Sequence, residues 1–436
     1  MSILMKPELR CNLQCKYCYE KDTRRQVDIG VDVDAVIKAA GEVYETEGSG
    51  DSFCLHGGEP TLLPKTEFEK ILKFSFDKSG RSSIQTNGTL INDDHIRMFK
   101  QYKTGVGVSI DGRWPLNELR WAGSEKKTKE TTEKTISNIY QLIESGLTPG
   151  LIVVLSKANA TKERLPLLKD FLQEMFNAGI NSLRLNLVIS NEWGLSSEEA
   201  KEAYLELCQY TLENTKRMYQ PFRDMVDNLL GLGMGTCVFT KCDFYHTHAG
   251  KAIIGDGSRT CCLKTAGNDR PFLWSNQYSD IRYQVLQSIS RNEGGCGGCR
   301  YWRVCYGFCP SETPGGDWRN KALYCEAYHA CFEYIEKSLK GLMPNVILVT
   351  DTNPKDEEKD YVERKGNRWS VDPFRAMSKD VHNPSTWKRC ENQCVTEKQE
   401  IQEQRGKRNA KPVPGKPGYY HADHADQGGN KQYGAC

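Results

Sequence analysis

The sequence predicts an α/β protein, in which a partial (β/α)6 barrel related to the eight-unit barrel is followed by a cysteine-rich domain. Through residues 1–190, apolar β-branched runs alternate with amphipathic segments of helical spacing. Polar and reactive side chains cluster directly after these runs, where parallel α/β folds place their sites. From Cys237 to Cys331 the chain is short-segmented and rich in glycine and cysteine, which favours a domain stabilised by metal sites.

The barrel is expected to comprise about six βα units. The expected strands are one before Cys11 and then 52–58, 82–88, 105–112, 151–156 and 182–188. Residues 66–76 carry Phe68, Ile71 and Leu72 at helical spacing, and Thr66 and Glu69 match a capping box. Residues 135–146 place apolar side chains on one helical face and end at a glycine.

Composition shifts divide the chain into four parts. These are the barrel (1–195), a helical bridge (196–235), the cysteine-rich domain (236–340) and a polar extension (341–436). The extension has the composition of a disordered tail, with a docking arm and a fused substrate-like peptide ending in Cys436 as the alternatives. Truncation after residue 345 is therefore expected to leave catalysis intact.

Bulk composition excludes several classes of protein. The formal net charge of +2 gives no electrostatic case for a nucleic-acid partner or an anionic membrane surface. No apolar run approaches the roughly 20 residues that span a bilayer, and residues 1–10 lack the apolar core of a signal peptide. We therefore expect a cytoplasmic protein. Eighteen cysteines beside eight histidines then favour metal ligation over disulfides.

Three cysteines near the start of the chain form the pattern CxxxCxxC: Cys11, Cys15 and Cys18. A structural zinc site needs four ligands, and the next cysteine is Cys54, in an expected strand. A four-iron cluster held by three thiolates leaves one iron open to a small molecule. The motif therefore predicts a reactive cluster, with zinc or chance spacing as the alternatives.

This motif resembles that of the radical S-adenosylmethionine (SAM) enzymes, in which an aromatic residue, here Tyr17, often precedes the last cysteine. HGGEPTL (56–62), QTNGTLI (85–91) and SIDG (109–112) resemble further segments of that family. The resemblance implies a 5′-deoxyadenosyl radical made from SAM. The SAM-binding residues it implies are Tyr17, Gly57, Gly58, Glu59, Pro60, Gln85, Asn87, Ser109 and Arg120. Singly, the glycine and asparagine motifs are compatible with simple turns, and Arg120 with a surface ion pair.

A second cysteine field resembles the SPASM domain found in a subset of these enzymes. CGGCRYWRVCYGFC (296–309) is preceded by C-x14-G-x4-C and followed by Cys325. The resemblance implies two auxiliary four-iron clusters, hence three [4Fe–4S] clusters in all, and a reductant such as flavodoxin or ferredoxin. The implied auxiliary ligands are Cys237, Cys242, Cys262 and Cys309 for the first cluster and Cys296, Cys299, Cys305 and Cys325 for the second. A pair of zinc ribbons is the alternative.

The resemblance covers residues 5–340 and extends to anaerobic sulfatase-maturating enzymes and peptide maturases. In the sulfatase-maturating enzymes an aspartate base follows the cysteine of G-x4-C, whereas Leu263 follows Cys262 here. Asp256 and Asp243 are the replacement candidates. We therefore expect a radical SAM enzyme that cross-links a ribosomally made peptide through a thioether or carbon–carbon bond. The alternatives are formylglycine formation in a protein substrate and a non-enzymatic iron–sulfur or zinc protein.

Overall fold

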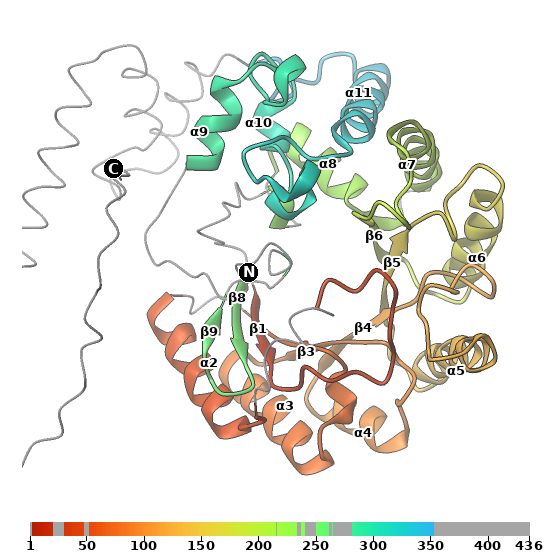
Figure 1. The fold of residues 1–436 in the computed structure, drawn as a ribbon, viewed down its shortest axis with the longest axis vertical. Coiled ribbons are helices and arrows are strands. Elements are labelled where there is room, and N and C mark those ends of the chain that lie inside the picture. The colour runs from red at the N-terminus through yellow and green to blue at the C-terminus, as the bar shows by residue number, and fades with distance from the viewer. Residues whose placement is uncertain are drawn as a thin grey trace, which may run out of the picture. The chain divides into compact units, whose positions relative to one another are not determined.

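The computed structural model describes residues 2–20, 30–47, 52–214, 216–232, 237–239, 250–260, 264 and 281–352. Within them, residues up to Asp351 belong to one compact unit (Figure 1). The unit that follows, Thr352–Cys436, is described only at its first residue. In the described part of the chain, no helix combines the length and apolar character needed to cross a membrane.

The compact unit is built on a nine-stranded sheet in the order β7-β6-β5-β4-β3-β2-β1-β8-β9. All neighbours pair in parallel except β8 and β9, which are antiparallel. The strands are β1 (Ser2–Lys6), β2 (Ser52–Leu55), β3 (Ser82–Thr86), β4 (Thr104–Ser109), β5 (Gly150–Leu155), β6 (Ser182–Leu187), β7 (Met218–Gln220), β8 (Gly250–Ile254) and β9 (Arg259–Thr260). The expected parallel α/β barrel is confirmed.

Helices cover the outer side of this curved sheet (Figure 1). Helix α3 begins at Lys65 directly after Pro64, so Thr66 lies inside the first turn and the expected capping box does not form. Helix α7 does carry a capping box, between Ser196 and Glu199. The helices are α2 (Val33–Glu47), α3 (Lys65–Ser79), α4 (Asp93–Gln101), α5 (Glu125–Glu144), α6 (Leu165–Asn177), α7 (Ser197–Leu212), α8 (Phe222–Leu229), α9 (Ile281–Ser288), α10 (Trp302–Cys305) and α11 (Cys325–Leu342).

The two faces of the sheet differ in composition. Alternate strand residues such as Phe53, Ile84 and Leu185 are buried in the hydrophobic core shared with the helices. The residues between them point to the concave face and are only half-buried, as period-two alternation requires. These half-buried residues include Cys54, Ser83, Gln85, Ser109, Ile152, Val154, Arg184, Asn186 and Gln220. The concave face is therefore a largely polar wall, with Cys54 on it rather than in the packed core.

The sheet is longer than six strands at both ends. Strand β7 lies within the segment expected to be a helical bridge and pairs with β6. Strand β8 comes from the segment expected to be the cysteine-rich domain, and it covers the other edge of β1. An unpaired edge of β1 would expose backbone groups, so β8 completes the barrel although it lies far away in sequence.

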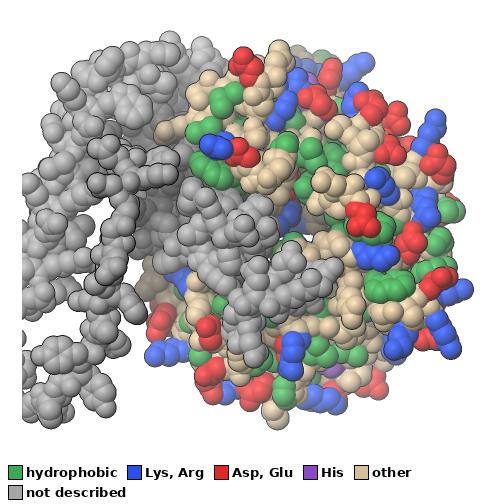
Figure 2. All heavy atoms as spheres, in the orientation of Figure 1, with side chains coloured by type: hydrophobic (Ala, Val, Ile, Leu, Met, Phe, Trp, Pro, Cys, Tyr) green, Lys and Arg blue, Asp and Glu red, His purple; other side chains and the backbone are tan. Residues whose placement is uncertain are grey.

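Helix α11, which follows the cysteine-rich loop, packs against the helices of the barrel. It packs along α7, where the fully buried thiols of Cys208 and Cys331 contact one another. On the face shown in Figure 2, basic and acidic side chains are interspersed over the described surface.

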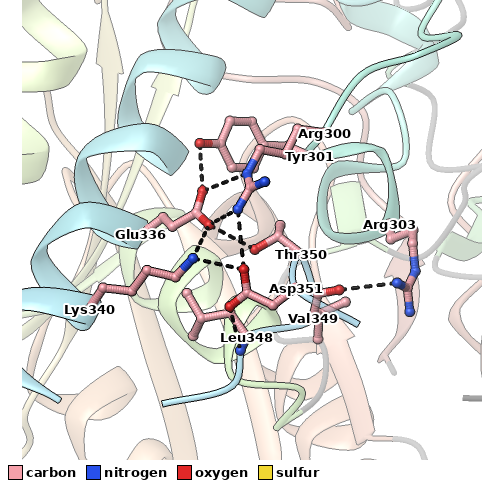
Figure 3. Close-up of polar contacts among 9 residues, drawn as sticks. All are labelled: Arg300, Tyr301, Arg303, Glu336, Lys340, Leu348, Val349, Thr350 and Asp351. Carbon is pink, nitrogen blue, oxygen red and sulfur yellow. Dashed lines mark hydrogen bonds and ion pairs between the residues drawn. The ribbon is translucent and has the colours of Figure 1, made fainter. Parts of the chain in front are cut away.

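After α11 the chain returns over the cysteine-rich loop in a polar clamp (Figure 3). Glu336 accepts hydrogen bonds from Arg300, from the Tyr301 hydroxyl at 2.9 Å and from the Thr350 hydroxyl at 3.1 Å. Asp351 accepts from Lys340 at 2.7 Å, and Leu348 is fully buried. The compact unit thus ends at Asp351, beyond the boundary expected at residue 341.

Because of this clamp, truncation after residue 345 is expected to destabilise the protein, contrary to the expectation from composition. The cut removes the buried Leu348 and the Thr350 and Asp351 contacts, which together stabilise by about 3 kcal/mol. Truncation after residue 352 retains all of them and is the matched control. Thermal unfolding of the two truncated proteins measures the difference, and equal midpoints would show that the clamp contributes nothing.

Candidate active site

The three-cysteine motif occupies the loop between β1 and α2. Cys11, Cys15 and Cys18 are all half-buried, and the backbone N–H of Cys18 donates to the carbonyl of Cys15 at 3.1 Å. Burial raises the pKa of the Cys15 thiol to about 12, a net value that includes the lowering effect of Arg120 and the smaller raising effects of Cys18 and Cys11. The three thiols are therefore close together and would release protons when a metal binds.

The glycines of the GGEP motif allow this cysteine loop to approach the end of β2. Gly58 N–H donates to the Glu8 carbonyl and Glu59 N–H donates to the Arg10 carbonyl, both at 2.9 Å. A Cβ on Gly58 would lie 2.1 Å from the Arg10 oxygen, and one on Gly57 would lie 2.3 Å from the Glu8 oxygen. Only glycine fits at both positions, so the motif holds the cysteine loop against the barrel.

Glu59 is a buried hydrogen-bond acceptor that connects the ends of two strands. Its carboxylate is fully buried and accepts from the Thr61 backbone and hydroxyl, from the Thr86 hydroxyl at 2.6 Å and from the Asn87 N–H at 2.7 Å. These four donors occupy the carboxylate oxygens, and Pro60 starts the short 3-10 turn that follows. Glu59 thus ties β2 to the end of β3.

Asn87 extends this connection to the cysteine loop. Its side-chain amide donates to Asn12 at 2.8 Å and lies 3.8 Å from the Cys11 sulfur. Asn12 in turn donates to the Thr89 hydroxyl at 2.8 Å. Beside them, Gln85 donates to Ser109 at 2.8 Å on the concave face. Of the expected SAM-binding residues of β3 and β4, Asn87 therefore contacts the cysteine loop, and Gln85 and Ser109 contact each other.

A buried charge pair lies on the other side of the cysteines. Asp111 accepts hydrogen bonds from the Tyr17 hydroxyl, from Arg120 at 3.1 Å and from the Val154 N–H at 2.9 Å. Arg120 is 7% exposed and its buried Nε has no acceptor within the described residues. Arg120 is thus a buried partner of Asp111 rather than a surface residue, and it keeps one donor for a ligand.

Two further contacts were not anticipated from the sequence. The backbone N–H groups of Gln14 and Lys16 donate to the carbonyls of Trp121 and Leu119. The Lys16 ammonium lies 4.9 Å from the Trp121 ring and 4.8 Å from the Trp193 ring. These contacts anchor the exposed side of the cysteine loop. Asp111 had a visible signal, the SIDG motif, whereas Lys16 and Trp193 had none.

These residues fit the cofactors that the sequence motif implies. Three adjacent thiols supply three ligands to a four-iron cluster, the glycine pair brings backbone groups close, and the free Arg120 Nε suits a carboxylate. Cys11, Cys15 and Cys18 would hold the cluster, and the residues around Gly57, Gln85 and Arg120 would hold SAM. Once bound, the cluster and SAM would together supply a carbon radical able to remove a hydrogen atom from a substrate. The chain itself orients the reactants and limits the access of water.

Four of the auxiliary cysteines also lie together. The pKa of Cys305 is raised by burial and then by the charges of Cys325, Cys296 and Cys299, so all four thiols are neighbours. The loop is tight, with the Cys299 N–H donating to the Cys296 carbonyl at 3.0 Å. The four cysteines that the SPASM resemblance assigns to one cluster are therefore brought together by the structure.

The other auxiliary site is described only in part. Burial and the nearby Cys309 raise the pKa of Cys237, so these two thiols are close. Cys242, Cys262 and Asp243 lie outside the described residues. Asp256 is exposed in the turn after β8 and accepts from the Ser258 N–H at 2.8 Å. The assignment of a catalytic base stays a prediction. Within the described ranges, no three His, Cys, Asp or Glu side chains lie in an arrangement that could hold one metal ion.

His56, the first residue of the HGGEP motif, is expected to make stability depend on pH. Its Nδ1 accepts the Gly57 N–H at 2.8 Å, so the neutral ring is favoured. Burial, with the nearby Lys6, lowers the pKa of His56 to about 4. Since the unfolded value is about 6.5, the stabilisation is complete above that pH and is lost as the pH falls towards 4.

Urea unfolding of the metal-free protein at several pH values between about 7 and 4.5 measures this effect. His56→Gln is expected to flatten the profile relative to the wild-type protein. His95 and His329 also have lowered pKa values, and they act equally in both proteins. Parallel profiles would contradict the assignment to His56.

Comparisons with known proteins agree with this geometry. Residues 6–165 match the family model of the radical SAM superfamily. These residues form a radical SAM domain. A cysteine-type anaerobic sulfatase-maturating enzyme of Clostridium novyi is 24% identical over 78% of this chain and 98% of the relative. A serine-type enzyme of Bacteroides thetaiotaomicron is 24% identical over 74% of this chain and 86% of the relative.

The fold of this chain is shared with solved structures. Native anSMEcpe with bound AdoMet superposes with a TM-score of 0.62 at 18% identity, covering 79% of this chain and all of that one. The similarity therefore extends past the radical SAM domain into the C-terminal region. The predicted family and fold are confirmed, and the protein is related to anaerobic sulfatase-maturating enzymes.

Proposed function

We propose that this radical SAM enzyme oxidatively modifies a side chain of a peptide or protein substrate. The main observation behind this proposal is that three separate segments meet the loop of Cys11, Cys15 and Cys18. They are the GGEP turn, the segment of Asn87 and the Asp111–Arg120 pair, and the sheet that carries them has a polar concave face. An enzyme of this kind needs a radical source beside an open wall on which a substrate can lie. The three cysteines would hold the radical source, and the concave face would offer the wall.

Two auxiliary clusters complete the proposed enzyme. The grouping of Cys296, Cys299, Cys305 and Cys325 supports one, and the closeness of Cys237 and Cys309 supports the other. Such clusters accept the electron left after hydrogen abstraction, or bind a substrate thiolate. Protein reconstituted without air is expected to bind about twelve irons. Zinc with little iron would contradict this part of the proposal.

The nature of the substrate rests on the relatives. The Clostridium novyi sulfatase-maturating enzyme matches along 98% of its length. One similar structure, native anSMEcpe, was solved with AdoMet and the Cp18Cys peptide. These findings favour conversion of a cysteine or serine to formylglycine. The leucine at 263, where the family's base is an aspartate, favours the second candidate, formation of a thioether or carbon–carbon cross-link. A ferredoxin or flavodoxin would supply the reducing electron in both cases.

The test is SAM cleavage by the reconstituted, reduced enzyme in the presence of cysteine-containing peptides. Cys15→Ala is expected to abolish release of 5′-deoxyadenosine, whereas Cys208→Ala, which changes a buried thiol outside the three expected cluster sites, retains it. The mass of the peptide distinguishes the candidates. A cross-link leaves the peptide two hydrogens lighter, whereas formylglycine replaces the thiol by an aldehyde. Absence of SAM cleavage with every peptide, and of any change in the cluster's paramagnetic signal on adding SAM, would overturn the proposal.

A further inference from the structure

Arg184 is a cation on the concave face, and no carboxylate of the described residues pairs with it. Its Nε and Nη2 both donate to one oxygen of Gln220, at 3.3 and 3.2 Å, and its Nη1 has no acceptor within the described part of the chain. The side chain is only half-buried. A guanidinium has five donors arranged to bind both oxygens of a carboxylate, and here most of that capacity is unused.

Three buried cations of the described residues are paired with a carboxylate or bound by several backbone carbonyls. Lys6 pairs with Glu20 at 2.6 Å, and Arg120 pairs with Asp111. Arg282 donates to the backbone carbonyls of Trp318, Phe308 and Gly307. Arg184 differs from all three because its hydrogen-bond partner among the described residues is a neutral amide. Its charge also acts on the thiols of Cys54 and Cys237, and neither of these is a carboxylate.

The position of Arg184 relates it to the expected cofactor site. Register places Ser109, Ile152, Arg184 and Gln220 in one row across strands β4 to β7. Ser109, which accepts from Gln85, is two strands away from Arg184, or about 10 Å at ordinary strand spacing. The charge of Arg184 also acts on Cys54 of β2, where it opposes the effect of burial on the thiol. Arg184 thus lies on the concave face, in the same row as the expected SAM-binding residue Ser109.

We propose that Arg184, oriented by Gln220, binds a carboxylate of the substrate and selects peptides that carry an acidic group near the modified residue. The inference rests on the proposed function and adds a substrate class to it. The carboxylate comes from an aspartate or glutamate side chain or from a peptide C-terminus. Gln220 holds the guanidinium in place without neutralising it, and its own amide lies 3.4 Å from Asp224.

A pool of synthetic peptides with one fixed cysteine and randomised flanks tests this proposal. Peptides retained by the reconstituted enzyme with SAM are sequenced, once with an amidated pool and once with a free-acid pool. The wild-type enzyme is expected to enrich carboxylate-bearing peptides roughly tenfold or more. Enrichment of aspartate and glutamate in the amidated pool identifies side chains, and enrichment confined to the free-acid pool identifies the C-terminus.

Two variants separate charge recognition from a structural role. Arg184→Gln is expected to abolish the enrichment. Gln220→Glu keeps the arginine but gives it an internal anionic partner, so it is expected to abolish the enrichment as well. Arg184→Lys keeps the positive charge but loses the planar guanidinium that binds both oxygens of a carboxylate. This variant is expected to retain part of the enrichment. Arg81→Gln, a change at an exposed position after α3, is the control and leaves the enrichment unchanged.

The result that overturns the inference is an equal peptide profile in the wild-type enzyme and in Arg184→Gln, or a wild-type profile without carboxylate enrichment. Thermal unfolding of each variant shows that it is folded. Because peptide retention is measured separately from 5′-deoxyadenosine release, failure of the inference is distinct from failure of the proposed function. An enzyme that cleaves SAM without selecting carboxylates contradicts only the role of Arg184.

Discussion

Replacing Gly58 by alanine is expected to abolish iron binding at Cys11, Cys15 and Cys18. The new Cβ would lie 2.1 Å from the Arg10 carbonyl oxygen and 2.3 Å from the Leu9 carbonyl oxygen. Both are backbone atoms of the cysteine loop, so no side chain can rotate away to make room. The loop must instead move off β2, which breaks the Gly58 and Glu59 hydrogen bonds to it. We expect a loss of about 3 kcal/mol of stability.

Gly105→Ala is the matched control for this change. Gly105 lies in β4, its backbone is not in the left-handed region, and the nearest atom to an added Cβ is 3.9 Å away. Iron content and thermal unfolding are measured for both variants, beside a variant with all three cysteines replaced by alanine. Gly58→Ala is expected to match the triple variant in iron content, and Gly105→Ala to match the wild-type protein. Full iron content in Gly58→Ala would show that the cysteine loop does not depend on this contact.

The sequence is a good guide where local patterning decides the structure. The runs around 82–88, 151–156 and 182–188 contain β3, β5 and β6, because alternation with buried helices is a local property. Strands β7, β8 and β9 were not predicted. β7 has three residues, and β8 forms because β1 has a free edge, which no local window contains. The end of the compact unit at Asp351 was also missed, since Glu336 and Lys340 hold a segment whose composition is polar.

In the candidate active site, too, the sequence predicts what local patterns decide and misses what depends on distant segments. Cysteine spacing and the glycine pair were visible in the sequence, because ligand geometry and close backbone approach restrict which residues fit. The importance of Asp111 depends on three other segments, which provide Tyr17, Arg120 and Val154. Arg184 occupies an ordinary alternating position in β6, and only the absence of an acidic neighbour in the described structure distinguishes it.

Asp111→Asn is expected to cost about 3–5 kcal/mol, because it leaves the buried Arg120 without a counter-charge. Burial alone lowers the pKa of Arg120, but Asp111, Tyr17 and Cys15 raise it above its usual value. In the variant, a neutral amide replaces the carboxylate, so the hydrogen bond from Arg120 loses its anionic acceptor and is weaker. Weaker SAM binding is expected in addition, since Arg120 is no longer held in place beside the cysteines.

Two comparisons show whether the loss arises from the unpaired charge. In the double variant Asp111→Asn, Arg120→Met both charges are absent, so its loss of stability should be smaller than the sum of the two single losses. Asp94→Asn makes the same chemical change in the exposed Lys65–Asp94 ion pair, where the expected cost is below about 1 kcal/mol. Urea unfolding of the metal-free proteins measures stability, and titration of the reconstituted enzymes measures SAM affinity. Additive losses in the double variant would mean that Asp111 and Arg120 act independently, and the buried pair would then not be what orients Arg120 toward the cofactor.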